Sequence, residues 1–138
     1  MFRILSANSE YILAVTRILV GISFATHGGQ KFFDLFSGIP HQMPEPMLYT
    51  AGTIELVGGI MIALGLITNW AAFISSGLMA AAYFIAHFDF SGPYLPSQNR
   101  GELAVVYCWF FLYLAAHGPG AWSLDGRLTR GAAADSTT

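Results

Sequence analysis

Four long apolar stretches, separated by short polar or Gly- and Pro-rich breaks, restrict the fold of this sequence more than any other feature. They cover residues 11–33, 47–67, 70–88 and 100–117. A helix needs about 20 predominantly apolar residues to cross a bilayer, and each stretch reaches or approaches that length. Because lipid offers no hydrogen bonds to the backbone, helices are the expected structure. The sequence therefore predicts one all-α domain, an integral membrane bundle of four transmembrane helices, followed by a polar tail over residues 118–138.

Composition argues against a soluble protein. The chain is 54% hydrophobic and 10% charged, with a mean hydropathy of +0.54, whereas soluble domains carry about 25% charged residues. A soluble bundle would need broad polar faces, which most of these stretches lack. The net charge of −2 gives no indication of nucleic-acid binding. Cys108 is the single cysteine, so no intrachain disulfide can form, and we expect no metal site.

The N-terminal segment "MFRILSANSEY" does not resemble a cleavable signal peptide, because its polar residues precede the apolar run. We therefore expect the first span to be retained as an anchor. Orientation follows from the cationic residues at the two ends. Arg3, Arg127 and Arg130 lie on one side of the expected bundle, against Lys31 and Arg100 on the other. This excess predicts that both termini are cytoplasmic, with loops 34–46 and 89–100 outside and a turn at Thr68–Asn69 inside.

Rows of small residues on three expected helices predict close helix packing, since small side chains let backbones approach one another in lipid. The rows are Gly21, Ala25 and Gly29; Gly52 and Gly59; and Ala72, Ser76 and Ala80.

Two charged residues interrupt the apolar stretches at depth, Arg17 and Glu55. A charge inside the membrane costs at least about 2.5 kcal/mol, so it should face the bundle interior and find a partner. Arg17 and Glu55 are therefore predicted to pair. The alternative is that Arg17 reaches the interface alone with its long side chain.

Other polar residues gather at the end of the expected bundle that faces the outside of the cell. Lys31 and Asp89 are interpreted as interfacial anchors. The remaining candidates for a quinone or partner site are His27, His87, Arg100, Glu102, Tyr83 and Trp109. Two histidines at similar depth can ligate haem, but these glycine-rich, aromatic helices leave little room for it. A quinone headgroup needs less: one or two hydrogen-bond donors and an aromatic wall.

The segments "RILVGISFATHGGQKFF", "TIELVGGIMIALGLIT" and "ELAVVYCWFFLYLAAHGPGAWSLD" resemble the DoxX family of small bacterial four-helix membrane proteins. The resemblance covers residues 11–127 and implies location in the bacterial inner membrane. It assigns motif positions to Arg17, Gly21, His27, Gly28, Lys31, Glu55, Gly58, Gly59, Gly65, Glu102, Gly118, Pro119, Gly120, Ser123, Leu124 and Asp125. The family is similar to the membrane subunit of a thiosulfate:quinone oxidoreductase, which implies that a separate polypeptide would handle any sulfur chemistry.

Two functions follow as hypotheses. The first is a quinone-interacting membrane subunit of a redox complex, with no intrinsic cofactor besides the quinone. The second is a non-catalytic scaffold, whose buried pair fixes helix register while its outer surface docks a partner. A small transporter is less favoured, because no row of polar residues runs through the full depth of the expected bundle. The expected partners are the lipid bilayer and either other protein subunits or further copies of the chain.

Overall fold

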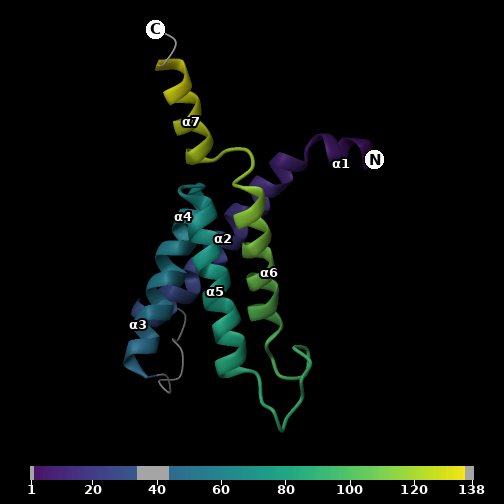
Figure 1. Cartoon of the computed structure of the whole chain (residues 1–138), viewed down its shortest axis with the longest axis vertical. Coiled ribbons are helices and arrows are strands. Elements are labelled where there is room, and N and C mark those ends of the chain that lie inside the picture. Colours follow the sequence, from purple (N-terminus) through teal and green to yellow (C-terminus); the bar gives the residue numbers. More distant parts are fainter. Residues whose placement is uncertain (1, 34–43, 136–138) are drawn as a thin grey trace.

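The computed structural model describes residues 2–33 and 44–135, and the side chains up to residue 130. Every regular element in these residues is helical, which confirms the all-α class (Figure 1). The elements are α1 (Phe2–Ala7), α2 (Ser9–Phe33), α3 (Glu45–Thr53), the π-helical turn η2 (Ile54–Gly58), α4 (Gly59–Leu64), α5 (Thr68–Ala86), α6 (Glu102–His117) and α7 (Leu124–Asp135).

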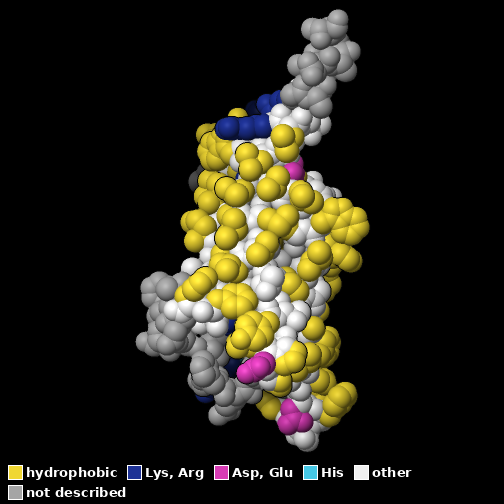
Figure 2. Space-filling model, turned by 90° about the vertical axis from the view of Figure 1, so that its left-hand side faces the viewer, with side chains coloured by type: hydrophobic (Ala, Val, Ile, Leu, Met, Phe, Trp, Pro, Cys, Tyr) yellow, Lys and Arg dark blue, Asp and Glu magenta, His cyan; other side chains and the backbone are white. Residues whose placement is uncertain are grey.

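Among the described residues, three helical segments are long and apolar enough to cross a membrane. They are Ser9–Phe33, Glu45–Leu64, which combines α3, η2 and α4, and Thr68–Ala86, and the shorter apolar helix Glu102–His117 accompanies them. Large apolar side chains cover the outer surface, as lipid contact requires (Figure 2). The predicted helical membrane bundle is confirmed.

The bundle consists of two pairs of long helical segments. Helix α2 packs along α3, η2 and α4, while α5 packs along α6. The core between them contains the fully buried Phe24, Ile62, Phe111 and Leu114. Both ends of the described chain lie at the end of the bundle where α4 is joined to α5 (Figure 1). The loop 87–101 and the start of α3 lie at the opposite end, so the predicted up-and-down path is correct.

Small residues bring α2 against α4, as their spacing predicts. A Cβ added to Gly21 would lie 2.7 Å from the Ala63 nitrogen, and one added to Gly59 would lie 2.5 Å from the Ala25 nitrogen. Only glycine allows the two backbones to approach so closely. On α5, the Ser76 hydroxyl donates a hydrogen bond to the Cys108 carbonyl of α6 at 2.8 Å.

The turn between the second and third spans lies earlier than predicted. Thr68 and Asn69 begin α5, and the turn is formed by residues 65–67. Gly65 ends α4 with φ of +69°, in the left-handed region that glycine tolerates. The Asp125 carboxylate then accepts hydrogen bonds from the Ile67 and Thr68 nitrogens and from the Thr68 hydroxyl. A residue distant in sequence thus caps α5, which no local pattern could indicate.

The region predicted as a polar tail is folded through residue 135. Residues 118–123 cross the end of the bundle, and α7 follows them (Figure 1). The Ser123 hydroxyl accepts a hydrogen bond from the Gly126 nitrogen, which caps α7. Positions 136–138 of the predicted tail and most of the predicted 34–46 loop lie outside the described residues.

Candidate functional site

Arg17 and Glu55 are both buried, but the predicted pair between them is wrong. The guanidinium of Arg17 is bonded to backbone carbonyls, and Glu55 pairs with Lys31. The reason is distance along α2. Arg17 precedes Lys31 by 14 residues, which is about 21 Å on a helix. The two buried charged groups therefore belong to opposite ends of the bundle.

Five carbonyl oxygens surround the Arg17 guanidinium, and we call this arrangement the arginine cradle. Its Nε donates to Pro119 at 2.8 Å, Nη1 donates to Ile62 and Ala63 at 2.7 Å each, and Nη2 donates to Ala121 and Trp122 at 3.3 and 3.1 Å. An arginine side chain has five N–H donors, so all are used. Ile62 and Ala63 lie in the last turn of α4, where a cation is favoured. Arg17 thus fastens residues 118–123 to α4.

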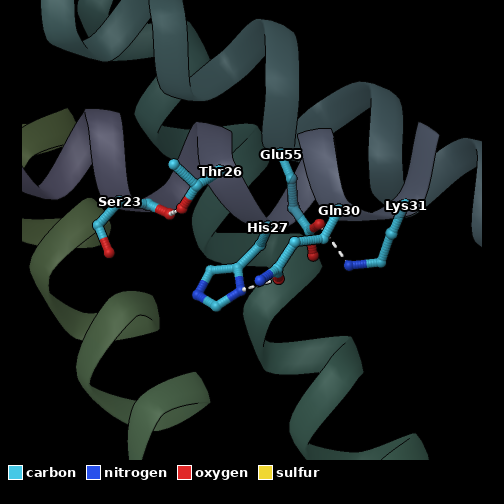
Figure 3. Close-up of polar contacts among 6 residues, drawn as sticks. All are labelled: Ser23, Thr26, His27, Gln30, Lys31 and Glu55. Atoms are coloured by element: carbon cyan, nitrogen blue, oxygen red, sulfur yellow. Dashed lines mark hydrogen bonds and ion pairs between the residues drawn. The ribbon is translucent and has the colours of Figure 1, made fainter. Parts of the chain in front are cut away.

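At the other end, Lys31 of α2 and Glu55 of η2 form an ion pair whose side chains are each 7% exposed. The interpretation of Lys31 as an interfacial anchor is therefore wrong. Figure 3 shows the Lys31 ammonium facing the Glu55 carboxylate, with His27 and Gln30 on the same side of α2. Glu55 lies in a π-helical turn, a form that often occurs at functional sites. The η2 turn packs against both α2 and α5.

The ion pair borders a cavity of about 260 Å³, which we call the polar cavity. Helices α2, η2, α5 and α6 and the loop before α6 contribute its lining: Phe24, His27, Lys31, Glu55, Met79, Ala82, His87, Arg100, Leu103, Ala104 and Tyr107. Three of the predicted site residues, His27, His87 and Arg100, therefore meet in one cavity. Arg100 is exposed at its edge and has φ of +62°, a conformation that is uncommon outside glycine.

Hydrogen bonds fix the orientation of both histidines. His87 Nδ1 lies 3.2 Å from the Asn99 carbonyl, which can only accept, so this nitrogen carries the proton. His27 Nδ1 lies 3.3 Å from Gln30 Oε1, and the His27 ring meets Tyr107 edge-on at 6.2 Å. When the rings are neutral, each Nε2 is then an acceptor, and when protonated it is a donor.

The other predicted site residues lie outside the polar cavity. Tyr83 is half-buried beside it, stacks on His87 at 6.5 Å and donates a hydrogen bond to the Tyr94 carbonyl. Glu102 is exposed, and Trp109 is 67% exposed on the outer surface of α6. Asp89 is also exposed and is bonded within its own loop, where the backbone and hydroxyl of Ser91 hold its pKa below the usual range.

Sequence reasoning missed Tyr107 and the partner of Glu55. Tyr107 is 6% exposed, and its hydroxyl lies 2.8 Å from that of Ser23, joining α6 to α2. The recurrence of Ala104, Tyr107, Phe111 and Leu114 along one face of α6 could have indicated that this tyrosine points inward. Lys31 stands one turn after His27, so it shares a helix face with a residue that was already a candidate.

The DoxX family model matches residues 12–88, which include most of α2, the Lys31–Glu55 pair and α5. The chain belongs to the DoxX family. A protein of Haemophilus influenzae is 44% identical over 121 residues, covering 85% of this chain and 90% of that protein. The inner membrane protein YqjF of Escherichia coli is 31% identical over 121 residues, covering 84% and 91%. An uncharacterized membrane protein of Mycobacterium tuberculosis is 29% identical, covering 96% and 90%. No solved structure matches.

Proposed function

We propose that this DoxX-family membrane protein binds the headgroup of a quinone in the polar cavity and serves as the membrane subunit of a redox complex. The observation that carries the proposal is the meeting of two histidines, a buried ion pair and a tyrosine around one cavity at the end of a membrane bundle. Intramembrane ionisable groups generally mark functional sites. Such a combination exceeds what interfacial anchoring requires.

Size and donor set both suit a quinone headgroup. The cavity volume of about 260 Å³ is slightly below the range of about 300–1,000 Å³ for sites that enclose a drug-sized ligand. A single quinone ring therefore suits it, while the isoprenoid tail would remain in lipid. Phe24 and Tyr107 supply an aromatic wall. Lys31, with two ammonium protons beyond the one given to Glu55, and Arg100 are the donors for carbonyl oxygens.

A bound quinone would accept two electrons and two protons, and a bound quinol would release them. The residues of this chain would hold and move the protons: Glu55 and the Nε2 atoms of the two histidines are the acceptors at the cavity. The chain has one cysteine, Cys108, and no CxxC pair. Electrons would therefore come from, or pass to, another polypeptide of the complex.

The test is binding of a short-chain benzoquinone and of its quinol to the protein purified in mild detergent, together with extraction of any quinone that co-purifies. We expect His27→Phe and His87→Phe to lower the affinity for the quinol about tenfold, because each variant removes an Nε2 acceptor for a quinol hydroxyl. His117→Phe is the matched control, because His117 is exposed at the opposite end of α6. Wild-type affinity in all three variants, or no quinone binding in the wild type, would contradict the proposal.

A second candidate function is a non-catalytic scaffold for other protein subunits or for further copies of the chain. It is favoured by the Lys31–Glu55 pair itself, which joins α2 to η2 and fixes their register. Mass spectrometry of proteins that co-purify in mild detergent separates the two functions when combined with the quinone measurement. A partner bound with undiminished affinity by the His27→Phe and His87→Phe variants, in the absence of bound quinone, would support the scaffold.

We also propose that the protein lies in the bacterial inner membrane with both termini in the cytoplasm. The exposed Arg3, Arg127 and Arg130 belong to the end that carries the termini, and cytoplasmic ends are enriched in such cations. Cysteines placed at the exposed Ser97 and Asn69, on a Cys108→Ala background, should report the two sides. An impermeant maleimide should label position 97 in intact cells and spare position 69. The reverse pattern would invert the orientation.

A further inference from the structure

An apolar groove of about 740 Å³ runs along the outer surface between α2 and α4, separate from the polar cavity. We call it the lipid-facing groove. Its floor contains the small residues Ala25, Gly29, Gly59 and Ala63. Larger side chains of the two helices form its walls: Ile18, Ile22 and Phe33 from α2, and Leu56, Ile60 and Leu64 from η2 and α4. The close approach of the helices through Gly21 and Gly59 thus leaves a shallow channel with a smooth floor.

One end of the groove is cationic. Trp122, Ser123 and Arg127 line both the groove and a second hollow of about 350 Å³, to which Arg130 also contributes. Figure 2 shows Lys and Arg side chains beyond a continuous hydrophobic face, near the end of the molecule that carries the C-terminus. Both arginines are exposed, and Arg130 donates one hydrogen bond from Nε to the Gly126 carbonyl. Asp125, two residues before Arg127, accepts hydrogen bonds from Ile67 and Thr68.

The arginine cradle positions the aromatic residue at this end. Arg17 holds the carbonyl of Trp122, whose φ of +52° is unusual for a large side chain. The indole is 60% exposed and lies 5.3 Å from the Tyr11 ring. Tryptophan and tyrosine prefer the level of the lipid headgroups. The pair therefore places this end of the groove, with Arg127 and Arg130, at the membrane–water interface.

We infer that the lipid-facing groove and the two arginines together form a binding site for an anionic glycerophospholipid of the leaflet on the side of the termini. An acyl chain occupies the groove, and Arg127 and Arg130 bind the phosphate. Basic residues at the mouth of a groove between membrane helices are typical of sites for anionic headgroups. Arginine suits a phosphate because its planar donors bind two oxygens at once.

The length of the groove fits one acyl chain. Along α2 it extends from Ile18 to Phe33, a span of 15 residues or about 22 Å. The hydrocarbon of one leaflet is about 15 Å thick, half of the core. A chain that starts at the arginines therefore lies within the groove for its full length. The anionic headgroup matches the cationic end of the groove, and the acyl chain matches its apolar length.

Native mass spectrometry of the full chain, released from nanodiscs of equal phosphatidylglycerol and phosphatidylcholine, tests the site. We expect the wild type to retain phosphatidylglycerol at least tenfold over phosphatidylcholine. The double variant Arg127→Gln/Arg130→Gln should lose this preference while keeping some of either lipid. Arg3→Gln is the matched control, because Arg3 is an exposed arginine in α1 that does not line the groove.

A second variant tests the groove itself. Thr26 lines it, and its hydroxyl donates a hydrogen bond to the Ser23 carbonyl of the same helix. Thr26→Trp should fill the channel and lower retention of both lipids several-fold. Thr50→Trp is its control, with the same kind of hydroxyl bond on an exposed part of α3. Equal retention of the two lipids by the wild type, an unchanged preference in the double arginine variant, or a lipid-free dimer seated on the groove would each overturn the site.

Discussion

The two ends of this bundle bury a cation in opposite ways. At the end that carries the termini, Arg17 is fully buried and gives its five donors to five carbonyls. At the other end, Lys31 has one acid, Glu55, and both border a cavity with two histidines. A group whose hydrogen bonds are all made inside the protein has nothing left for a ligand. The comparison indicates that the arginine cradle holds the fold together, whereas the polar cavity keeps hydrogen-bonding groups available for a ligand.

The largest loss of stability should come from replacing Arg17, the arginine of the cradle. Arg17→Leu leaves five carbonyls in a buried site without donors, and each buried unsatisfied group costs about 1–3 kcal/mol. We expect a loss of about 5 kcal/mol or more in the free energy of unfolding in detergent, with release of residues 118–123 from α4. Limited proteolysis of the C-terminal region would detect that release.

Arg17→Lys sharpens this test. Lysine has three donors for the five carbonyls, so the loss should be smaller than for leucine but still large. Arg3→Leu, an exposed arginine in α1, is the control. A lysine variant as stable as the wild type would show that charge alone is needed, and the assignment of all five hydrogen bonds would then be wrong.

Breaking the ion pair at the other end should have the next largest effect. Lys31→Met or Glu55→Gln alone removes one member of a buried pair, which costs about 3–5 kcal/mol when the remaining charge is left without a partner. The double variant should be closer to the wild type than the sum of the single losses. The cycle of Arg17→Leu with Glu55→Gln should instead be additive, because these residues do not meet. Strong coupling between Arg17 and Glu55 would contradict the structure.

The sequence was sufficient for the class of fold, because length and hydropathy of the four stretches depend on local composition alone. It also placed His27, His87 and Arg100 at one end, since an up-and-down path requires only the order of the helices. It failed where contacts join distant segments. The carbonyl acceptors of Arg17 have no side-chain signature, so a carboxylate was chosen as its partner instead. The position of Lys31 near a helix end predicts an interfacial anchor, whereas its partner Glu55 belongs to a different helical segment.

A smaller effect is expected at the link between α7 and α5. Burial would raise the pKa of Asp125, but hydrogen bonds from Thr68 and Ile67 and the charge of Arg17 outweigh it and lower the pKa. Asp125→Ala removes this cap and should cost about 1 kcal/mol at neutral pH. Since the folded pKa lies below the unfolded value of about 3.9, the contribution is complete above that value and is lost as the pH falls through the folded pKa.

Measurements of unfolding at pH 7 and at pH values below 4 check both the size and the sign of this effect. The difference between the wild type and Asp125→Ala should shrink at the lower pH. Glu102→Ala, an exposed acid at the other end of the bundle, should show no such difference at neutral pH. A stability gap that widens in acid would mean that the folded pKa of Asp125 is raised.

The smallest effects should come from the polar and aromatic residues that share the end of the polar cavity without lining it. Trp109 and Glu102 are exposed, so Trp109→Leu and Glu102→Gln should change the free energy of unfolding by less than about 0.5 kcal/mol. Affinity for the short-chain quinol should also stay at the wild-type level, while His87→Phe lowers it. This contrast separates a defined cavity from a generally polar end. If Glu102→Gln weakened quinol binding as much as His87→Phe, the ligand would have to lie nearer the start of α6 than the cavity does, and the division between the two ends would rest on the arginine cradle alone.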